Sequence, residues 1–213
     1  MNPNPKLYHI VHLDRLSSIL QDEHLFSDRL ITERGDSLVS IGMKHIKSRR
    51  LYKSRLTSHP ELFVGDCVPF YFCPRSVMLY VINSRTSVDI DYRDGQAPIV
   101  HLVSDFSTVT RWAEENNLRW AFTSSNASSN YFEDFSNADY LSSLNWKAIN
   151  ATFWAGELKE GKQAEFLLEK KLPFSLIEEI GVYSAIQKEQ VEKLLKSVGN
   201  TFVNVSIKKN WYY

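Results

Sequence analysis

Strand-like and helix-like hydrophobic patterns follow one another along the chain without a fixed spacing. Residues 7–12 (LYHIVH) alternate like a strand and run into 13–25, where apolar positions recur on one helical face. Further strand-like runs cover 70–72, 77–83, 97–104, 119–125, 180–184 and part of 201–213. Helices are predicted over 107–117, 140–154 and 185–199. Because no regular βαβ spacing appears, this order predicts an α+β fold.

One apolar run contains a carboxylate. Residues 161–168 read GKQAEFLL, and on a strand Gln163 and Glu165 share one face while Phe166 lies on the other. Glu165 is therefore either a solvent-facing residue of an edge strand or part of the floor of a polar cleft. The pattern leaves both interpretations open.

Composition describes an ordinary soluble protein of 213 residues with 43% hydrophobic and 23% charged residues. We expect one domain over residues 1–213. Lys and Arg (25) balance Asp and Glu (25), so the net charge predicts no partner and any electrostatic argument is local.

The two cysteines, Cys67 and Cys73, match no zinc spacing and favour a reducing compartment. The chain shows no signal-peptide pattern and no apolar run of membrane-spanning length, so we expect a cytoplasmic protein without a membrane partner. The six histidines show no metal-binding spacing, which predicts no metal site. A glycine-rich phosphate loop is also absent, so a bound nucleotide would need another architecture.

A basic run, KHIKSRRLYKSR (44–55), contains six Lys and Arg residues and no acid. Such a concentration creates a local positive potential suited to the phosphates of a nucleotide or a nucleic acid. A solvated helix face is the equally plausible alternative.

Aromatic residues gather in VPFYFCPRSVMLY (68–80), where two prolines prevent a continuous central strand. Phe70 and Phe72 are expected in the core, whereas Tyr71 on the opposite face is the candidate for a ligand contact. Arg75 could hold a phosphate or a carboxylate. His12, between a strand and a helix, is a candidate cleft residue, although a hydrogen bond at the start of the helix is its default role.

A long polar stretch at 124–140 is typical of a functional or mobile loop. Several stretches in order, including IGMKHIKSRR, VGDCVPFYFCPRSVMLY, GQAPIVHLVSD, FTSSNAS, KQAEFLL and the terminal WYY, resemble the DarT family of DNA ADP-ribosyltransferase toxins from bacterial toxin–antitoxin pairs. The resemblance implies an ADP-ribosyltransferase fold, a split α+β sheet with flanking short helices and a central NAD cleft. It also implies transfer of ADP-ribose to a base of single-stranded DNA, with release of nicotinamide.

Carried over residue by residue, Glu165 matches the catalytic glutamate of the family, and Arg50 matches an arginine that is catalytic and contacts NAD. Arg49 would take that place if the alignment slipped by one. His12 matches the NAD-binding histidine of the first strand-to-helix segment. The expected cofactor set is completed by Tyr71, Arg75, Met78 and Gln163. The expected DNA contacts are Arg49, Lys53, Tyr131, Phe132 and Trp154, the last three from the substrate-facing loop at 124–162.

The chemistry fits these assignments. Cleavage of the nicotinamide–ribose bond gives positive charge on the ribose, which the Glu165 carboxylate could stabilise through the ribose hydroxyls. The same carboxylate could accept the proton that the acceptor base loses. Partial burial would raise its pKa for that second role, whereas Arg50 would oppose the shift.

The short WAGELKEGKQAE segment and the FTSSNAS loop favour guanine over thymine as the modified base. The expected antitoxin removes the modification and is a macrodomain hydrolase, or a NADAR-type protein if guanine is the target. Two alternatives stay open: an ADP-ribosyltransferase acting on RNA or protein, and a non-catalytic module that grips single-stranded nucleic acid and for which Glu165 is dispensable.

Overall fold

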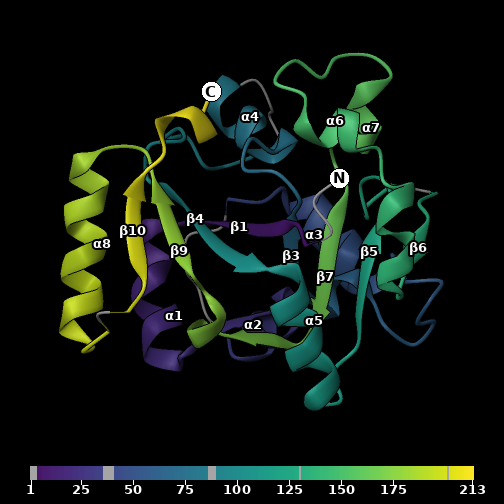
Figure 1. Cartoon of the computed structure of the whole chain (residues 1–213), viewed down its shortest axis with the longest axis horizontal. Helices are drawn as coiled ribbons and strands as arrows, with labels where there is room; N and C mark the ends of the chain where they lie inside the picture. The colour runs from purple at the N-terminus through teal and green to yellow at the C-terminus, as the bar shows by residue number, and fades with distance from the viewer. Residues whose placement is uncertain (1–3, 36–40, 86–89, 130, 201) are drawn as a thin grey trace.

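The computed structural model describes residues 4–35, 41–85, 90–129, 131–200 and 202–213. Across these residues one eight-stranded sheet forms the centre of the molecule (Figure 1). In spatial order its strands are β10 (Asn204–Ile207), β9 (Glu179–Val182), β4 (Ile99–Asp105), β1 (Lys6–His12), β3 (Cys67–Tyr71), β7 (Glu165–Glu169), β5 (Trp120–Thr123) and β6 (Asp134–Phe135). Neighbours are antiparallel except β10 and β9, which are parallel.

The sheet splits between β1 and β3. β1 pairs with β4 along its whole length, and β3 pairs with β7 along its whole length. Between β1 and β3, however, the only registered pair in the described residues is Tyr8 with Tyr71. Pro69 has no N–H to donate, and its carbonyl is instead bonded to the His9 ring at 2.8 Å. The predicted α+β fold with a split sheet is therefore confirmed.

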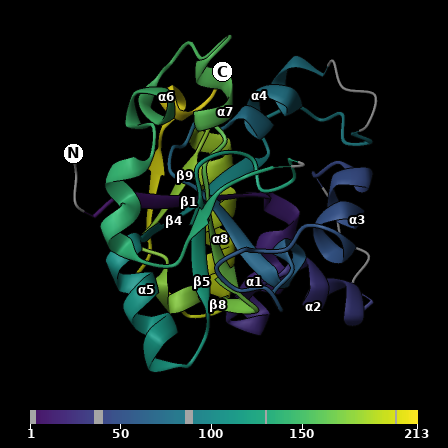
Figure 2. The ribbon, with the colours of Figure 1, turned by 90° about the vertical axis from the view of Figure 1, so that its right-hand side faces the viewer.

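Helices cover both faces of this sheet (Figure 2). α5 (Phe106–Glu115) lies on one face, and α1 (Leu16–Asp22), α2 (Asp28–Glu33) and α3 (Lys44–Tyr52) lie on the other. α8 (Ala185–Ser197) flanks the β10 edge. Shorter helices complete the described chain: α4 (Val77–Ser84), α6 (Trp146–Asn150) and α7 (Leu158–Gly161). A second, two-stranded sheet pairs β2 (His24–Phe26) with β8 (Lys171–Pro173). Short 3₁₀ helices occur at Leu13–Arg15, Val64–Asp66, Ala138–Ser143, Phe174–Leu176 and Lys209–Trp211.

Aromatic rings fill the core under α5. Phe70, Phe122 and Phe166 are fully buried, and Phe106 meets Phe166 edge to face at 5.5 Å. Every residue of β7 is buried, so both faces of this strand are covered. This explains why alternation along GKQAEFLL did not distinguish a core face from a solvent face.

Two sequence predictions are wrong at the level of single elements. Residues 77–83 form α4 and not a strand, because Ser76 caps the helix by accepting a hydrogen bond from the Leu79 N–H at 3.2 Å. A short apolar run bounded by a cap does not distinguish strand from helix by periodicity alone. The helix predicted over 13–25 ends at Asp22, because Glu23 takes a left-handed conformation at φ 56° before β2 begins.

The terminal WYY motif joins the central strands. The Tyr212 hydroxyl donates to the Ile99 carbonyl of β4 at 2.7 Å and lies 3.2 Å from the Gly181 carbonyl of β9. Strands from both ends of the chain thus share one core, which favours one domain over residues 1–213, and that interpretation stays a prediction. In the described part of the chain, no helix combines the length and the apolar character needed to cross a membrane.

The free energy of unfolding should depend on pH through Glu169. Its buried carboxylate accepts three hydrogen bonds from Arg119, one from the backbone N–H and two from the guanidinium, at 2.8–3.0 Å. These bonds lower the pKa of Glu169 from 4.5 to about 2. The carboxylate therefore contributes stability that is fully present above pH 4.5 and is lost as the pH falls toward 2.

We expect Glu169→Gln to lower the free energy of unfolding by about 1–2 kcal/mol at pH 7 and to flatten its fall between pH 4.5 and 2. Denaturant titrations at a series of pH values measure this. Glu192→Gln, which removes an exposed partner of Lys188 at 3.7 Å, is the matched control. Parallel pH profiles for the wild type and Glu169→Gln would contradict the assignment.

Candidate active site

Arg50 and Glu165 form a buried ion pair between α3 and β7. Arg50 Nη1 lies 2.9 Å from Glu165 Oε2 and 3.2 Å from Oε1. The two side chains are 12% and 5% exposed. The residues are 115 positions apart in sequence, so only the fold brings them together.

Glu165 is fixed from several sides. It pairs with Tyr71 across β7 and β3, and its backbone N–H donates to Thr123 Oγ1 at 3.1 Å. Its Oε1 accepts a hydrogen bond from the Ala127 N–H at 3.3 Å. The residue is 4% exposed, so the solvent-facing interpretation of Glu165 is wrong.

Arg50 keeps its charge through attraction to the Glu165 carboxylate. Burial alone would lower the pKa of Arg50, but the Glu165 carboxylate beside it outweighs burial, and the pKa of Arg50 lies above its ordinary value. Burial, reinforced by the same carboxylate, raises the pKa of the Tyr71 phenol, which stays neutral. Arg50 Nη2 is buried and has no hydrogen-bond partner among the described residues. One donor of the pair is thus left for a ligand.

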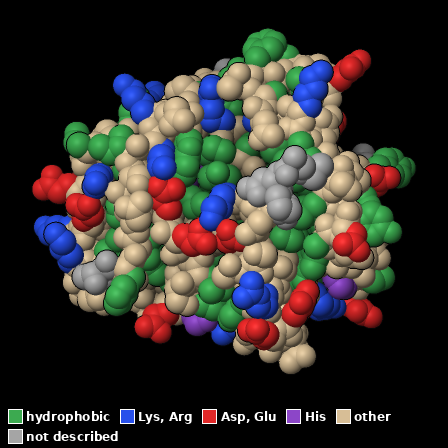
Figure 3. Space-filling view, viewed as in Figure 1, with side chains coloured by type: hydrophobic (Ala, Val, Ile, Leu, Met, Phe, Trp, Pro, Cys, Tyr) green, Lys and Arg blue, Asp and Glu red, His purple; other side chains and the backbone are tan. Residues whose placement is uncertain are grey.

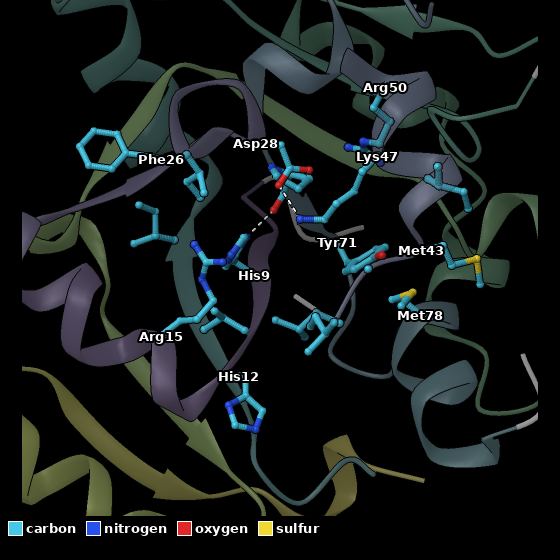
Figure 4. Close-up of a pocket in the computed structure, with 18 of the residues that line it drawn as sticks. His9, His12, Arg15, Phe26, Asp28, Met43, Lys47, Arg50, Tyr71 and Met78 are labelled. Atoms are coloured by element: carbon cyan, nitrogen blue, oxygen red, sulfur yellow. Dashed lines mark hydrogen bonds and ion pairs between the residues drawn. The ribbon is translucent and has the colours of Figure 1, made fainter. Parts of the chain in front are cut away.

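A central cleft opens where β1 and β3 diverge, with α2 and α3 along its side (Figure 4). Its polar and sulfur-containing lining residues include His9, His12, Arg15, Asp28, Met43, Lys47, Arg50, Tyr71 and Met78. Apolar side chains from β1, α1, β2, α2, α3 and β3 line most of the remaining wall. A mostly apolar cleft with a few convergent polar groups is the usual form of a cofactor site.

The histidines of the cleft are held by the backbone. His12 Nδ1 accepts a hydrogen bond from the Asp14 N–H at 3.2 Å, which confirms the hydrogen bond predicted at the start of the helical segment. The same side chain also lines the cleft. Burial lowers the pKa of His9, whose Nδ1 bonds to the Pro69 carbonyl. His9 is therefore neutral and adds no positive charge to the cleft.

Arg15, Lys47 and Arg50 bring positive charge to the cleft, and Asp28 balances part of it by pairing with Lys47 at 2.9 Å. Among the residues that the structure describes, no group of three or more His, Cys, Asp or Glu side chains is placed to hold a metal ion. The cleft thus suits a ligand that combines flat rings with anionic groups.

Four of the six predicted cofactor residues line this cleft, namely His12, Arg50, Tyr71 and Met78. The other two do not. The Arg75 guanidinium lies over the Tyr213 ring at 4.3 Å, and its Nε is buried without a partner in the described chain. Gln163 accepts a hydrogen bond from Asn126 Nδ2 at 3.0 Å and so supports the loop that carries Ala127. The cofactor contacts predicted for these two residues therefore stay predictions that the lining of the cleft does not support.

The opposite face of α3 borders a second hollow, which we call the basic hollow. It is lined by His45, Ser48, Arg49, Lys53, Ser54, Arg55, Ser129 and Phe132. Helical spacing explains the division, because positions 43, 46, 47 and 50 share one face and 45, 48, 49 and 53 share the other. Arg50 therefore faces Glu165 and Arg49 does not, which favours Arg50 as the catalytic arginine.

The predicted DNA contacts divide between two places. Arg49, Lys53 and Phe132 line the basic hollow, and Tyr131, next to Phe132, is 93% exposed. Trp154 does not line the hollow. Its Nε1 donates to the Tyr213 hydroxyl at 2.9 Å, and its ring meets Tyr80 edge to face at 5.2 Å.

Sequence reasoning missed His9, Arg15, Asp28 and Lys47 as lining residues of the cleft. Lys47 could have been found, because it lies three positions before Arg50 and therefore on the same helical face. Arg15 and Asp28 carry no local signal, since only the packing of the first 3₁₀ turn and α2 brings them to the cleft.

The C-terminal end of α3 is locked in place. Arg29 of α2 donates to the Leu51 carbonyl at 2.5 Å and to Asp66 Oδ1 at 2.7 Å. A Cβ added at Gly65 would lie 2.8 Å from the Leu51 backbone, so only glycine allows this approach. These contacts fix the turn that carries Arg50.

Comparison with known proteins identifies relatives over the whole fold. Residues 8–213 match the sequence model of the family described as "ssDNA thymidine ADP-ribosyltransferase, DarT". A DNA ADP-ribosyl transferase of Thermus sp. (strain 2.9) is 40% identical, with 99% of this chain and 97% of that protein covered. One of Escherichia coli O127:H6 is 28% identical, with 100% and 96% covered.

Solved structures agree. Thermus sp. 2.9 DarT in complex with ADP-ribosylated ssDNA superposes with a TM-score of 0.87 at 38% identity, covering 98% of this chain and 96% of that one. The same protein in complex with NAD+ gives 0.84 at 36% identity, covering 100% and 99%. Thermosipho africanus DarTG in complex with ADP-ribose gives 0.75 at 19% identity, covering 98% and 51%, which is a likeness of fold alone.

The ion pair yields a stability prediction. Removing one partner of a buried pair leaves the other charge uncompensated, so we expect Arg50→Leu and Glu165→Leu each to lower the free energy of unfolding by about 3–5 kcal/mol. The double variant should lose less stability than the sum of the two single losses. The difference, which is the coupling free energy of the pair, should be at least about 1–2 kcal/mol. Denaturant unfolding of the four proteins measures it. The exposed pair Lys188–Glu192 should show a coupling below about 0.5 kcal/mol, and an equally small value for Arg50–Glu165 would refute the buried pair.

Proposed function

Because the chain belongs to the DarT family of DNA ADP-ribosyltransferases, we propose that it transfers ADP-ribose from NAD to a base of single-stranded DNA and releases nicotinamide. The enzyme class, an NAD-dependent DNA ADP-ribosyltransferase, comes with family membership. The observation that supports this reaction best in the chain itself is the buried Arg50–Glu165 pair beside the split of the sheet.

NAD fits the central cleft chemically. Two cations beyond Arg50, namely Arg15 and Lys47, line the cleft and would face its two phosphates, and Tyr71 and Met78 offer flat and sulfur surfaces for the nicotinamide ring. The unpartnered Arg50 Nη2 is a donor for a ligand oxygen. We assign NAD to this cleft, and the existence of an NAD+ complex of the Thermus relative supports NAD as the ligand.

The reaction breaks the bond between the ribose carbon and the nicotinamide nitrogen, and nicotinamide leaves with the electron pair. The ribose is left with oxocarbenium character, which the Glu165 carboxylate stabilises through hydrogen bonds to the ribose hydroxyls. A nitrogen of the DNA base then forms the new bond to that carbon and loses a proton, for which the same carboxylate is the acceptor. Arg50 orients the carboxylate through hydrogen bonds to both of its oxygens.

The acceptor base we propose is thymine, because the matching family is described by its thymidine activity. The loop sequence FTSSNAS, which favours guanine in the sequence analysis, is held beside Glu165 by the Ala127 contact. The guanine expectation is not excluded by this contact and stays a prediction that a base-resolved assay tests.

By the same family membership we propose that the protein is the toxin of a toxin–antitoxin pair and acts in the bacterial cytoplasm, where chromosomal DNA lies. If thymine is modified, the antitoxin we propose is a hydrolase of the macrodomain type that removes the ADP-ribose. A NADAR-type protein takes that place if guanine is modified.

Labelling of oligonucleotides tests the reaction. Purified protein should attach ADP-ribose to single-stranded DNA only when NAD is supplied, and Glu165→Gln should lower kcat by about 10²–10³-fold while circular dichroism shows a folded protein. Glu178→Gln, an exposed carboxylate paired with Lys6, is the control and should label normally. Labelling of RNA or protein in place of DNA would support the alternative transferases. Salt-sensitive DNA binding without NAD consumption, unaffected by Glu165→Gln, would support the non-catalytic module.

Mass spectrometry of oligonucleotides that each contain one of the four bases tests the acceptor. We expect the added ADP-ribose on thymine. Modification of guanine would overturn the choice of base and leave the enzyme class intact, whereas no modification of any base would contradict the transferase itself.

A further inference from the structure

The basic hollow on the outer face of α3 has the composition of an anion site. Arg49, Lys53 and Arg55 line it together with His45, and no carboxylate belongs to its described lining. Elsewhere the charges are mixed: on the face of the molecule that carries α5, basic and acidic side chains are interspersed (Figure 3). The positive potential of the hollow is therefore local, in a chain whose formal net charge is zero.

Ser54 adds a buried donor to this hollow. The residue is 7% exposed, and its hydroxyl has no hydrogen-bond partner among the described residues. Its backbone is fixed, because its N–H donates to the Arg49 carbonyl at 2.9 Å and its carbonyl accepts from the Val64 N–H at 2.9 Å. A buried hydroxyl without a partner is costly, so its presence beside three cations points to a ligand with acceptor oxygens.

The hollow and the ion pair are neighbours through one loop. Ala127 donates its N–H to Glu165, and Ser129, two residues later, lines the hollow. Two residues span at most roughly 7 Å of extended chain. The hollow therefore lies close to the reacting carboxylate, yet α3 separates it from the central cleft, which has Arg15 and Lys47 for the phosphates of NAD.

We propose that the basic hollow binds one backbone phosphate of the DNA strand next to the target base, with Arg49 and the Ser54 hydroxyl donating to its oxygens. This inference rests on the proposed function, since it assumes that DNA is the acceptor. Phosphate contacts of this kind fix the register of a strand without reading its sequence. The hollow thereby sets which nucleotide reaches Glu165, while the loop beside Glu165 selects the base.

Oligonucleotides in which single linkages are neutral methylphosphonates test the subsite. At saturating NAD, one linkage near the modified base should raise the KM for DNA of the wild type about tenfold, and the other linkages should matter less. Ser54→Ala and Arg49→Gln should raise the KM for the unmodified oligonucleotide about three- to tenfold, leave the KM for NAD unchanged, and lose sensitivity to that one linkage.

Arg111→Gln removes an equal charge from the exposed surface of α5, on the other side of the sheet, and serves as the control (Figure 2). A rise in the KM for NAD in the two hollow variants would assign the hollow to the cofactor and overturn the proposal. Unchanged constants for both substrates would overturn it as well, with the proposed function intact.

If the wild type labels no oligonucleotide, the proposed function fails, and binding is measured directly by fluorescence anisotropy against salt concentration. The slope of log K against log salt should then fall by about 0.7 in Arg49→Gln if the hollow holds a phosphate of single-stranded DNA. An unchanged slope would refute the subsite independently of catalysis.

Discussion

Removing a guanidinium and a carboxylate from water costs several kcal/mol per ion, and the Arg50–Glu165 pair offsets this cost only through its geometry. Both carboxylate oxygens accept from one guanidinium nitrogen, and the Ala127 N–H supplies a further bond. The second terminal nitrogen of Arg50 has no partner within the described residues. The free protein thus carries an unsatisfied donor worth about 1–3 kcal/mol at the place where an anionic or hydroxylated ligand would bind. Stability is given up where chemistry is needed.

The same place is where the sheet divides. Tyr71 pairs with Tyr8 of β1 on one side and with Glu165 of β7 on the other. Past Tyr8 the β1–β3 ladder stops, because Pro69 cannot donate and His9 occupies its carbonyl. The cleft therefore begins one strand away from the carboxylate. A continuous sheet would have closed this space, so the break in pairing is a requirement of the site.

Patterns in the sequence predicted the elements that carry a clear period, such as β1, β4, α5 and α8, and the α+β class. They failed for α4, where a serine cap decided between two structures, and for the burial of Glu165, where both faces of β7 are covered. The family resemblance pointed to Arg50 and Glu165 as catalytic residues. The positions of the two neighbouring arginines on the helix then place Arg50, and not Arg49, on the face of α3 that meets Glu165. Arg75 and Gln163, which the resemblance also proposed, lie outside the lining of the cleft, because Arg75 stacks on Tyr213 and Gln163 bonds to Asn126.

The helix α3 joins the two proposed substrate sites in one element. Its one face lines the central cleft and its other face lines the basic hollow. Relative placement of NAD and DNA then depends on where this helix ends, and a misplacement of about 1 Å in a reacting complex costs roughly 10²-fold in rate. Gly65 and Arg29 hold that end, because the glycine lets the Leu51 backbone approach and the arginine binds its carbonyl. In the proposed reaction, contacts remote from the reacting atoms would thus set the distance between the ribose carbon and the base that captures it.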